Sequence, residues 1–293
     1  MANLKEIRTR IQSVTTTRQI TSAMKMVSAA KLRKGQDSII QMRPYANKLL
    51  QILTNLAHHV DSEEVAMYRN QREVNKILLV VITSNKGLCG SFNANISKLV
   101  ISEINENYQE LYDQGKVDIL CIGKKGAELL MAKGYKVTET RHDLLDDLSY
   151  DNTKKLAVDT VKKFLYSEYD LVKLYYNQFK NAATQLVTIN QYLPVPQPEQ
   201  SKADKENIDY ILEPSKEEIV AELIPKSLKV LFYKALLESN ASEHGARMTA
   251  MHKATDNATE MIRDLQLEYN KARQASITGE ILEIVGGAEA LKG

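Results

Sequence analysis

The residues best suited to chemistry in this sequence are two glycine-containing loops, five histidines and two cysteines. The loops Thr83–Ser91 and Gly123–Gly126 each follow a run of aliphatic and β-branched residues, which is where α/β folds place ligand sites. Neither loop matches G-x-G-x-x-G or G-x-x-x-x-G-K-[ST], the patterns whose backbone amides hold phosphate groups. We therefore interpret both loops as tight turns between strand and helix rather than as a nucleotide site.

The histidines and cysteines do not have the spacing of a reactive site. No two histidines show the i, i+4 spacing near a carboxylate that a zinc site requires. A Ser-His-Asp set stays open, although no G-x-S-x-G elbow supports one. Cys89 and Cys121 cannot build a disulfide framework, and we interpret them as structural thiols in a reducing compartment. We expect no catalytic, cofactor or metal site. The five histidines are His58, His59, His142, His244 and His252.

Length and composition indicate a folded protein without a membrane span. The 293 residues are 43% hydrophobic and 26% charged, which supports a core and argues against disorder of the whole chain. The longest aliphatic run, Ile77–Ile82, is far shorter than the ~20 residues needed to cross a bilayer. No apolar signal core follows Met1. These features predict a soluble intracellular protein.

The near-neutral total charge of +2 conceals an uneven distribution along the chain. Residues 1–60 carry +8, residues 61–214 carry −4, and residues 215–293 carry −2. Such asymmetry favours an acidic partner for the N-terminal segment, either nucleic acid, anionic lipid or an acidic protein surface. A basic face that only contacts solvent is the alternative, and charge alone does not decide between them.

Residues 1–60 are predicted to form one helix, because apolar residues recur at alternating spacings of four and three. This narrow stripe is typical of a coiled-coil seam. In the middle of the segment the frame positions are polar, and the apolar residues Ile20, Met24 and Val27 are displaced by one, which indicates a local slip of the frame. The frame consists of Leu4, Ile7, Ile11, Val14, Arg18, Thr21, Lys25, Ser28, Leu32, Ile39, Met42, Ala46, Leu49, Leu53, Leu56 and Val60.

Residues 215–293 are predicted to form a second, longer helix. The same spacing continues from Val230, and small residues alternate with large ones, which suits close helix approach. No proline follows Pro225, and Gly286-Gly287 is interpreted as the stop. The frame consists of Val230, Leu237, Ala241, His244, Met248, Met251, Thr255, Ala258, Ile262, Leu265, Tyr269, Ala272 and Ser276.

The residues between the helices, 74–193, are predicted to form an α/β domain. Their strands and helices alternate, which predicts a mostly parallel, Rossmann-like sheet with helices on its faces. The polar, proline-bearing stretch 194–214 is interpreted as a linker to the second long helix. The predicted strands are Lys76–Thr83, Val117–Ile122, Tyr135–Thr140, Asp170–Asn177 and Thr184–Tyr192, and the predicted helices are Gly123–Lys133 and Thr153–Ser167.

Chain order then predicts the topology. A domain inserted between two long terminal helices brings the helices together, so they should form an antiparallel coiled coil with the α/β domain attached. The second helix is the longer, and its last turns stay apolar beyond the reach of the first helix. Another molecule must cover them, because they would otherwise be an exposed apolar patch. The residues are Ile277, Ile281, Ile284, Val285, Ala288 and Leu291.

Three motifs of this sequence resemble the gamma subunit of F-type ATP synthases of the bacterial type. They are IRTRIQSVTTTRQITSAMKMVSAAKLRK (Ile7–Lys34), SNKGLCGSFN (Ser84–Asn93) and the stretch from ARMTAMHKATDNA to GGAEAL (Ala246–Leu291). The likeness spans the whole chain in order and spacing, and the two terminal motifs are highly specific.

The resemblance implies a rotor shaft that is not itself catalytic. In this family the antiparallel coiled coil stands inside a ring of three alpha and three beta subunits, and the α/β domain docks on the epsilon subunit and the membrane ring of c subunits. The implied function is to transmit rotation for ATP synthesis coupled to proton transport. The alpha/beta ring would cover the apolar end of the second helix, and an acidic beta-subunit loop would face the basic N-terminal helix.

The resemblance also implies residues for rotor–stator coupling. Met24 and Lys25, in AMKMV, correspond to the shaft near the acidic beta loop. Arg247, in ARMTAM, corresponds to a position on the opposing helix at about the same height. Packing of the Met24 side chain in the helix seam is an equally good interpretation of this residue. Gly245 stands where the family commonly has alanine, which would loosen the helix locally.

Four more coupling positions are implied near the C-terminus. Arg273 and Gln274, in NKARQA, match residues that engage beta-subunit loops, and Thr278 and Glu280 follow in the bearing segment. Gly279 stands where the bacterial family commonly has glutamine, which would loosen the helix locally beside Thr278 and Glu280.

The sequence also predicts a localisation and leaves two alternative functions open. The absence of a transit peptide and of a redox-active cysteine insert points to a bacterial protein, peripheral on the cytoplasmic side of the inner membrane and attached only through its complex. No cofactor and no nucleic acid are expected. The main alternative is a coiled-coil protein with a nucleotide-binding α/β domain, which stoichiometric ATP binding in equilibrium dialysis would support. A coiled-coil nucleic-acid binder would show a gel shift that weakens steeply with salt.

Overall fold

A computed structural model describes residues 4–57, 67–69, 72–196 and 215–290. The chain divides into two compact units, one of residues 1–28 with 248–293 and the other of residues 29–247. Both long helices, α1 (Leu4–Ala57) and α7 (Lys216–Ala290), contribute to both units. Among the described residues, no helix combines the length and hydropathy needed to cross a bilayer.

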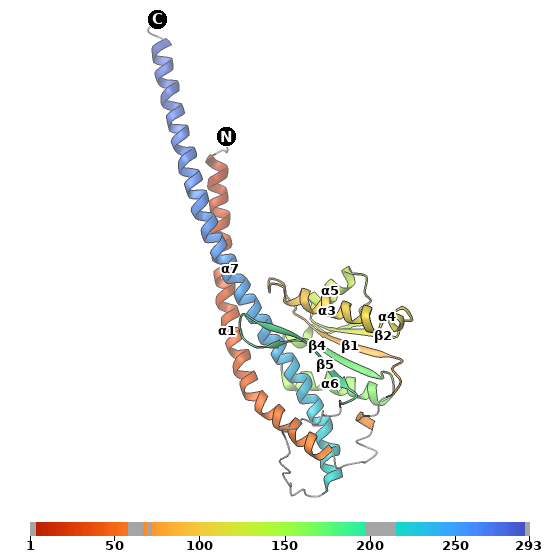
Figure 1. Cartoon of the computed structure of the whole chain (residues 1–293). Helices are drawn as coiled ribbons and strands as arrows, with labels where there is room; N and C mark the ends of the chain where they lie inside the picture. The colour runs from red at the N-terminus through yellow and green to blue at the C-terminus, as the bar shows by residue number, and fades with distance from the viewer. Residues whose placement is uncertain (1–3, 58–66, 70–71, 197–214, 291–293) are drawn as a thin grey trace. The chain divides into compact units, whose positions relative to one another are not determined.

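The unit of residues 29–247 contains a five-stranded sheet in the order β3-β2-β1-β4-β5 (Figure 1). The first four of these strands are parallel, and β5 pairs antiparallel with β4. The mostly parallel sheet predicted from the sequence is therefore confirmed. The strands are β1 (Ile77–Ile82), β2 (Val117–Ile122), β3 (Glu139–Thr140), β4 (Leu171–Phe179) and β5 (Gln185–Leu193).

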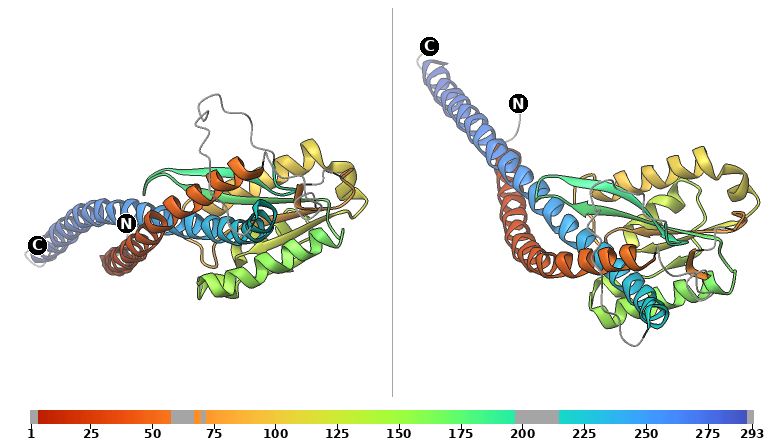
Figure 2. Two further views of the ribbon diagram at one scale, coloured as in Figure 1. Left: turned by 90° about the horizontal axis from the view of Figure 1, so that it is seen from below. Right: turned by 60° about the horizontal axis from the view of Figure 1, so that its bottom comes forward.

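Helices cover both faces of the sheet. All six residues of β1 are buried, as its unbroken aliphatic sequence predicts. Leu79 and Val81 pack against α3 (Phe92–Asn107) and α5 (Lys124–Ala132). On the other face, Leu78 and Val80 pack against α6 (Tyr150–Leu165) and the first part of α7 (Figure 2). The unit also contains the short helix α4 (Gln109–Asp113) and the 3₁₀ turn η1 (Asp143–Leu145).

The helix α3 is absent from the sequence prediction. Its inward-facing Ile96, Val100 and Ile104 follow the i, i+4 spacing of a helix that packs on a sheet. The predicted strand Tyr135–Thr140 shortens to Glu139–Thr140, because β2 pairs with β3 only at Leu120 and Cys121. Among the other predicted elements of the α/β domain, the strand Val117–Ile122 is confirmed with its bounds unchanged, and the remaining strands and helices are confirmed with ends shifted by one to three residues.

Within residues 29–247, α1 and α7 run antiparallel along the predicted seam. Leu32, Ile39 and Ala46 of α1 are buried, as are Leu237 and Ala241 of α7. The helices approach closely at Gly35, where an added Cβ would lie 3.2 Å from the Cβ of Ala241. The missing side chain therefore sets the helix spacing at this crossing.

In the other unit the seam keeps its frame, so the predicted slip in α1 is wrong. Thr21 and Ser28 are buried at the frame positions, whereas Ile20 and Val27 are 54% and 57% exposed. Thr21 remains in the seam because its hydroxyl finds a partner there: the Oγ1 atoms of Thr21 and Thr255 lie 2.8 Å apart. Ile20 and Val27 therefore lie on the outer face of α1, whereas Met24 is half-buried.

The predicted stop of the second helix is also wrong, because α7 runs through Gly286 and Gly287 to Ala290. Neither glycine adopts the positive φ that ends a helix at a glycine cap. A glycine in a helix interior costs ~1 kcal/mol but does not break the hydrogen-bond ladder. Val60 and Leu291, and most of the predicted linker 194–214, lie outside the described residues.

Candidate functional site

The carboxyl ends of β1 and β2 are where a nucleotide would bind in an α/β fold, held by backbone amides. The first amides of α5 donate to the residues that follow β1. The amide of Lys124 donates to Asn85 Oδ1, that of Lys125 to the carbonyl of Ser84, and that of Gly126 to Thr83 Oγ1. The donors that would cradle a phosphate are therefore engaged within the chain.

The glycines of this region are explained by close packing between β1 and α5. A Cβ at Gly126 would lie 2.5 Å from the side chain of Thr83, and one at Gly123 would lie 2.6 Å from the Thr83 carbonyl oxygen. Gly123 also has φ +112°, which other residues rarely adopt. This supports the interpretation of the glycine loop as a tight turn.

The loop after β1, here called the Ser84–Ser91 loop, is organised around a buried thiol. Cys89 Sγ accepts from Asn93 Nδ2 at 3.2 Å and lies 3.7 Å from Ser84 Oγ. Burial raises the pKa of Cys89, and it raises the pKa of Cys121 to about 12. Both thiols are buried and free, which supports a structural role for each.

Arg247 of α7 holds the same loop from the other side. Its Nη2 donates to the carbonyl of Lys86 at 2.9 Å and to that of Gly87 at 3.3 Å, and its Nε donates to the Gly87 carbonyl at 3.3 Å. Its Nη1 pairs with Glu243 Oε1 at 2.6 Å. The predicted coupling residue Arg247 is thus 8% exposed and engaged inside its own unit.

Two titratable groups beside Arg247 respond to this burial. Desolvation raises the pKa of Glu243, and the guanidinium of Arg247 opposes that rise in part. Burial, with Arg247 and Lys31, lowers the pKa of His244 to about 4. A neutral His244 can accept at Nδ1 from Arg247 Nη1, which lies 3.3 Å away.

A neighbouring residue, Leu88, forms the exposed tip of the Ser84–Ser91 loop. It has φ +62°, a left-handed conformation that costs a non-glycine residue roughly 1–2 kcal/mol. Its side chain is nevertheless 63% exposed, so packing within the chain does not explain the conformation. The sequence prediction missed both Leu88 and Glu243. The i, i+4 spacing of Glu243 and Arg247 could have indicated their ion pair.

Met24 and Lys25 lie in the unit of residues 1–28 and 248–293, and both side chains are half-buried. Lys25 Nζ lies 3.2 Å from His252 Nδ1, and His252 Nδ1 lies 3.4 Å from Asp256 Oδ2. Lys25 thus faces α7 at His252, five positions beyond Arg247.

The remaining predicted coupling residues lie on an uncovered stretch of α7. Arg273, Gln274, Thr278 and Glu280 are all exposed, and Glu280 accepts from Ser276 Oγ at a long 3.5 Å. The aliphatic side chains around them are exposed as well, with Ile284 the most exposed at 71%. The expected apolar, uncovered end of the helix is therefore present in the described residues. Its large members are Ile277, Ile281, Leu282, Ile284 and Val285.

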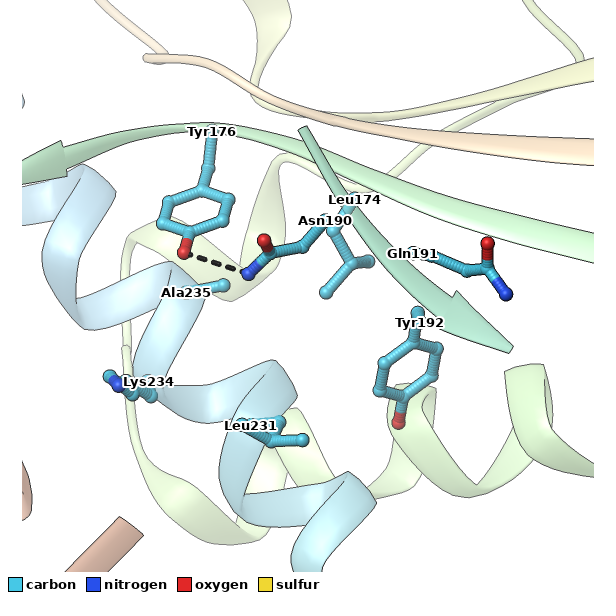
Figure 3. Close-up of a pocket in the computed structure, with 8 residues that line it drawn as sticks. All are labelled: Leu174, Tyr176, Asn190, Gln191, Tyr192, Leu231, Lys234 and Ala235. Atoms are coloured by element: carbon cyan, nitrogen blue, oxygen red, sulfur yellow. Dashed lines mark hydrogen bonds between the residues drawn. The ribbon is translucent and has the colours of Figure 1, made fainter. Parts of the chain in front are cut away.

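A small cavity between β4, β5 and α7 offers little room for a ligand (Figure 3). Its volume is about 50 Å³, against the ~300 Å³ or more of typical ligand pockets. The Tyr176 hydroxyl accepts from Asn190 Nδ2 at 3.1 Å within it. In the part of the chain that is described, no three His, Cys, Asp or Glu side chains come together as metal ligands.

Comparison with known proteins connects this architecture to one family. An ATP synthase family model matches residues 3–291. The chain is 58% identical to the ATP synthase gamma chain of Flavobacterium johnsoniae over the full length of both. It is 44% identical to the ATP synthase gamma chain of Chlorobaculum tepidum, again over the full length of both.

Two solved structures also resemble this chain. The chain is 27% identical to a chain from the central stalk and c-ring of the Tetrahymena thermophila mitochondrial ATP synthase, with a TM-score of 0.58 over 80% of this chain and 99% of that one. A rotor chain of the Euglena gracilis mitochondrial ATP synthase shares the fold, with 19% identity and a TM-score of 0.64 over 94% of this chain and 98% of that one. The chain belongs to the ATP synthase gamma chain family.

Proposed function

We propose that this chain is the central-stalk rotor subunit of an F-type ATP synthase and transmits rotation between a membrane ring of c subunits and a catalytic ring of alpha and beta subunits. Membership of the gamma chain family, with 58% identity over the full length, is the observation that carries the proposal. The likeness to a chain from a central stalk at 27% identity supports it. ATP synthesis coupled to proton transport is then the reaction that the rotor serves.

The exposed end of α7 supports a partner that surrounds it. The aliphatic side chains between Ile277 and Val285 are exposed, and burying each fully would contribute roughly 1.5–3 kcal/mol. The proposed cover is the inner surface of the alpha/beta ring. Arg273, Gln274, Thr278 and Glu280 lie on this stretch with free access to such a ring, which supports their proposed role in coupling.

The positive charge of α1 supports an acidic partner. Residues 1–60 carry +8, and the exposed Met26 and Val27 adjoin Lys25 on the same helix. We place an acidic beta-subunit loop here, ahead of nucleic acid or lipid, with Met24 and Lys25 as its contacts.

The chain itself contributes no catalytic site in this proposal. The amides at the start of α5 are engaged by Thr83, Ser84 and Asn85, so they offer no phosphate cradle. The epsilon subunit and the c-ring are the proposed partners of the α/β domain. The complex then places the chain at the cytoplasmic side of a bacterial inner membrane as a peripheral subunit.

The stoichiometry of the complex tests the proposal. The chain is co-expressed with the alpha and beta subunits of its own organism, and the complex is purified through a tag on beta. Native mass spectrometry should find three alpha, three beta and one copy of this chain. Recovery of an alpha/beta ring that lacks this chain would contradict the proposed rotor function.

Charge inversion at Lys25 tests the acidic contact. Lys25→Glu places a carboxylate opposite the acidic loop, so ions pumped per ATP hydrolysed should fall several-fold while the amount of assembled complex stays the same. Lys98→Glu, on the exposed face of α3, makes the same change of charge and should pump as wild type does. If Lys25→Glu pumps as well as Lys98→Glu does, Lys25 does not face an acidic loop.

A further inference from the structure

Arg43 of α1 joins three elements of the unit of residues 29–247. Its Nε donates to Glu238 Oε1 of α7 at 3.2 Å, and its Nη2 donates to the carbonyl of Phe179, the last residue of β4, at 2.7 Å. A guanidinium is a rigid fork, so two hydrogen bonds from one fork fix its position relative to both acceptors. Arg43 therefore holds α1 to α7 and to the sheet at a single point.

Glu238 depends on this contact because its side chain is not exposed at all, whereas that of Arg43 is 39% exposed. Glu238 Oε2 has no hydrogen-bond partner among the residues that the structure describes, so the pairing runs through Oε1 and Arg43. The carboxylate also lies close to β4, because burial and the charge of Glu238 raise the pKa of Tyr176 to about 12. Without Arg43, the chain would hold a buried carboxylate that nothing compensates, which is strongly destabilising.

The packing between α1 and α7 on either side of Arg43 is smooth. Gly35 approaches Ala241 across the two helices, and Ala46 packs with Val230. Burial of small and aliphatic side chains is non-directional, so it holds two helices together without selecting one position. Apolar interfaces of this kind lose their unique arrangement before they lose stability. A directional contact such as that of Arg43 is what selects one position of α1 along α7.

Stability alone does not account for the pair of Arg43 and Glu238. Replacing a buried ion pair with apolar residues of similar volume is often neutral or stabilising, although removing one partner is costly. What the pair adds to the apolar packing is direction. A second polar bridge, from Lys234 Nζ to Asn47 Oδ1, is exposed and long at 3.4 Å, so it contributes little.

We propose that Arg43 and Glu238, with the Phe179 carbonyl, form a clasp that keeps α1 at one position against α7 and β4 while the rotor bears load. The inference rests on the proposed function. Load means the turning force on the two helices when ions are pumped against a gradient. Because the clasp lies within the chain and touches no partner, Arg43 and Glu238 are positioning residues.

Urea unfolding of the full-length chain tests the pairing. Arg43→Met should lower the midpoint, because Glu238 then stays buried without its partner. Adding Glu238→Met to this variant replaces the whole pair with apolar side chains of similar length and should restore the midpoint. Absence of the loss, or absence of the recovery, would overturn the clasp. The double variant is called the clasp variant below.

Distances measured by electron paramagnetic resonance test the position of α1 in the same chain. Spin labels are attached at Gln41→Cys on α1 and Lys98→Cys on α3, both of which are exposed, whereas Cys89 and Cys121 are buried. The distance distribution should be about twofold broader in the clasp variant than in the wild-type chain, because apolar packing alone allows several positions. Equal widths would show that packing positions α1 without Arg43 and would overturn the proposal.

Ion pumping by the assembled complex in membrane vesicles tests the role under load. The clasp variant should start pumping at the wild-type rate, when no gradient opposes it. The largest gradient that it sustains at a fixed ATP concentration should fall about twofold, because load shifts α1 among the positions that the variant allows. A wild-type gradient would overturn the proposal. A proportional loss of initial rate and final gradient would overturn it as well, since that indicates a general defect.

Lys173 and Glu103 provide a matched control. Lys173 Nζ pairs with Glu103 Oε1 at 2.7 Å and both side chains are mostly buried, but the pair joins β4 to α3 and does not involve α1. Replacing both residues with methionine should leave the sustained gradient unchanged. An equal loss in this control would mean that loosening anywhere in the unit has the same effect, and it would overturn the clasp.

The outcomes separate this inference from the proposed function. If the wild-type chain does not assemble with alpha and beta subunits, the proposed function fails. If the wild-type complex assembles and pumps, and the clasp variant sustains the same gradient, the clasp alone fails.

Discussion

The two stretches of α7 on either side of Met248 are one continuous helix, yet they bury their side chains in different ways. In Lys216–Arg247, apolar residues cover most of the circumference: Val220, Leu228 and Phe232 face the sheet, and Val230 packs toward α1. In Met248–Ala290, burial is limited to a narrow seam that ends at Leu265. The first stretch is a core helix, and the second exposes the apolar surface that a partner would cover.

The difference shows where each stretch obtains its stability. Residues of the first stretch are stabilised by the fold of the chain itself, so their substitution should be felt in the isolated protein. Exposed residues of the second stretch have nothing in the chain to pack against, so their substitution should be felt only in the complex. The following predictions test that division in order of expected size.

The largest effect should come from the core of the first stretch. Phe232 is fully buried and packs on the ring of Tyr192, so Phe232→Ala should destabilise the isolated chain by about 3–5 kcal/mol in urea unfolding. Ile284→Ala, in the exposed stretch, should change that value by less than ~0.5 kcal/mol. A comparable loss in both variants would mean that the two stretches are not packed differently.

Two glycines of α7 provide a pair with opposite surroundings. At Gly279 an added Cβ meets nothing within 4 Å, so Gly279→Ala should stabilise the helix locally by about 1 kcal/mol. At Gly245 the Cβ would lie 3.1 Å from the carbonyl oxygen of Ala182, and the shift this requires should offset the same gain. Circular dichroism during thermal melting of each variant checks this. Equal stabilisation by both changes would contradict the close approach at Gly245.

The smallest effect should be a dependence on pH in the first stretch. The pKa of His244 is about 4 when folded and 6.5 when unfolded, so the unfolded chain binds its proton more readily. Stability from this group is complete above pH 6.5 and is lost as the pH falls toward 4. The raised pKa of Glu243 acts in the opposite direction. Urea midpoints of His244→Gln should therefore fall less than those of wild type between pH 6.5 and 4; parallel curves would be inconsistent with a buried, neutral His244.

Much of this fold could be predicted because its signals are local. The aliphatic run of β1 and the seam residues of both helices depend on burial patterns that the sequence carries directly. The frame slip was wrong because periodicity alone cannot show that the Thr21 hydroxyl finds a partner in Thr255. The stop at Gly286-Gly287 was wrong because a glycine permits a helix end without requiring one.

The candidate site was harder to predict because its contacts join distant parts of the chain. The motif around Arg247 placed that residue among the coupling positions, but the carbonyls it binds lie about 160 residues earlier in the sequence. The strain at Leu88 leaves no trace in composition or spacing, since leucine rarely adopts a positive φ. Neither interaction could be read from the sequence without the fold.

Single-molecule rotation tests the central claim most directly. Lys133, on the exposed surface after α5, is replaced by cysteine, and a probe is attached to it in a complex fixed through its alpha/beta ring. Cys89 and Cys121 are buried and should not compete for the label. Addition of ATP should turn the probe continuously in one direction. A complex that hydrolyses ATP at the full rate while the probe stays fixed would contradict the role of this chain as the rotor.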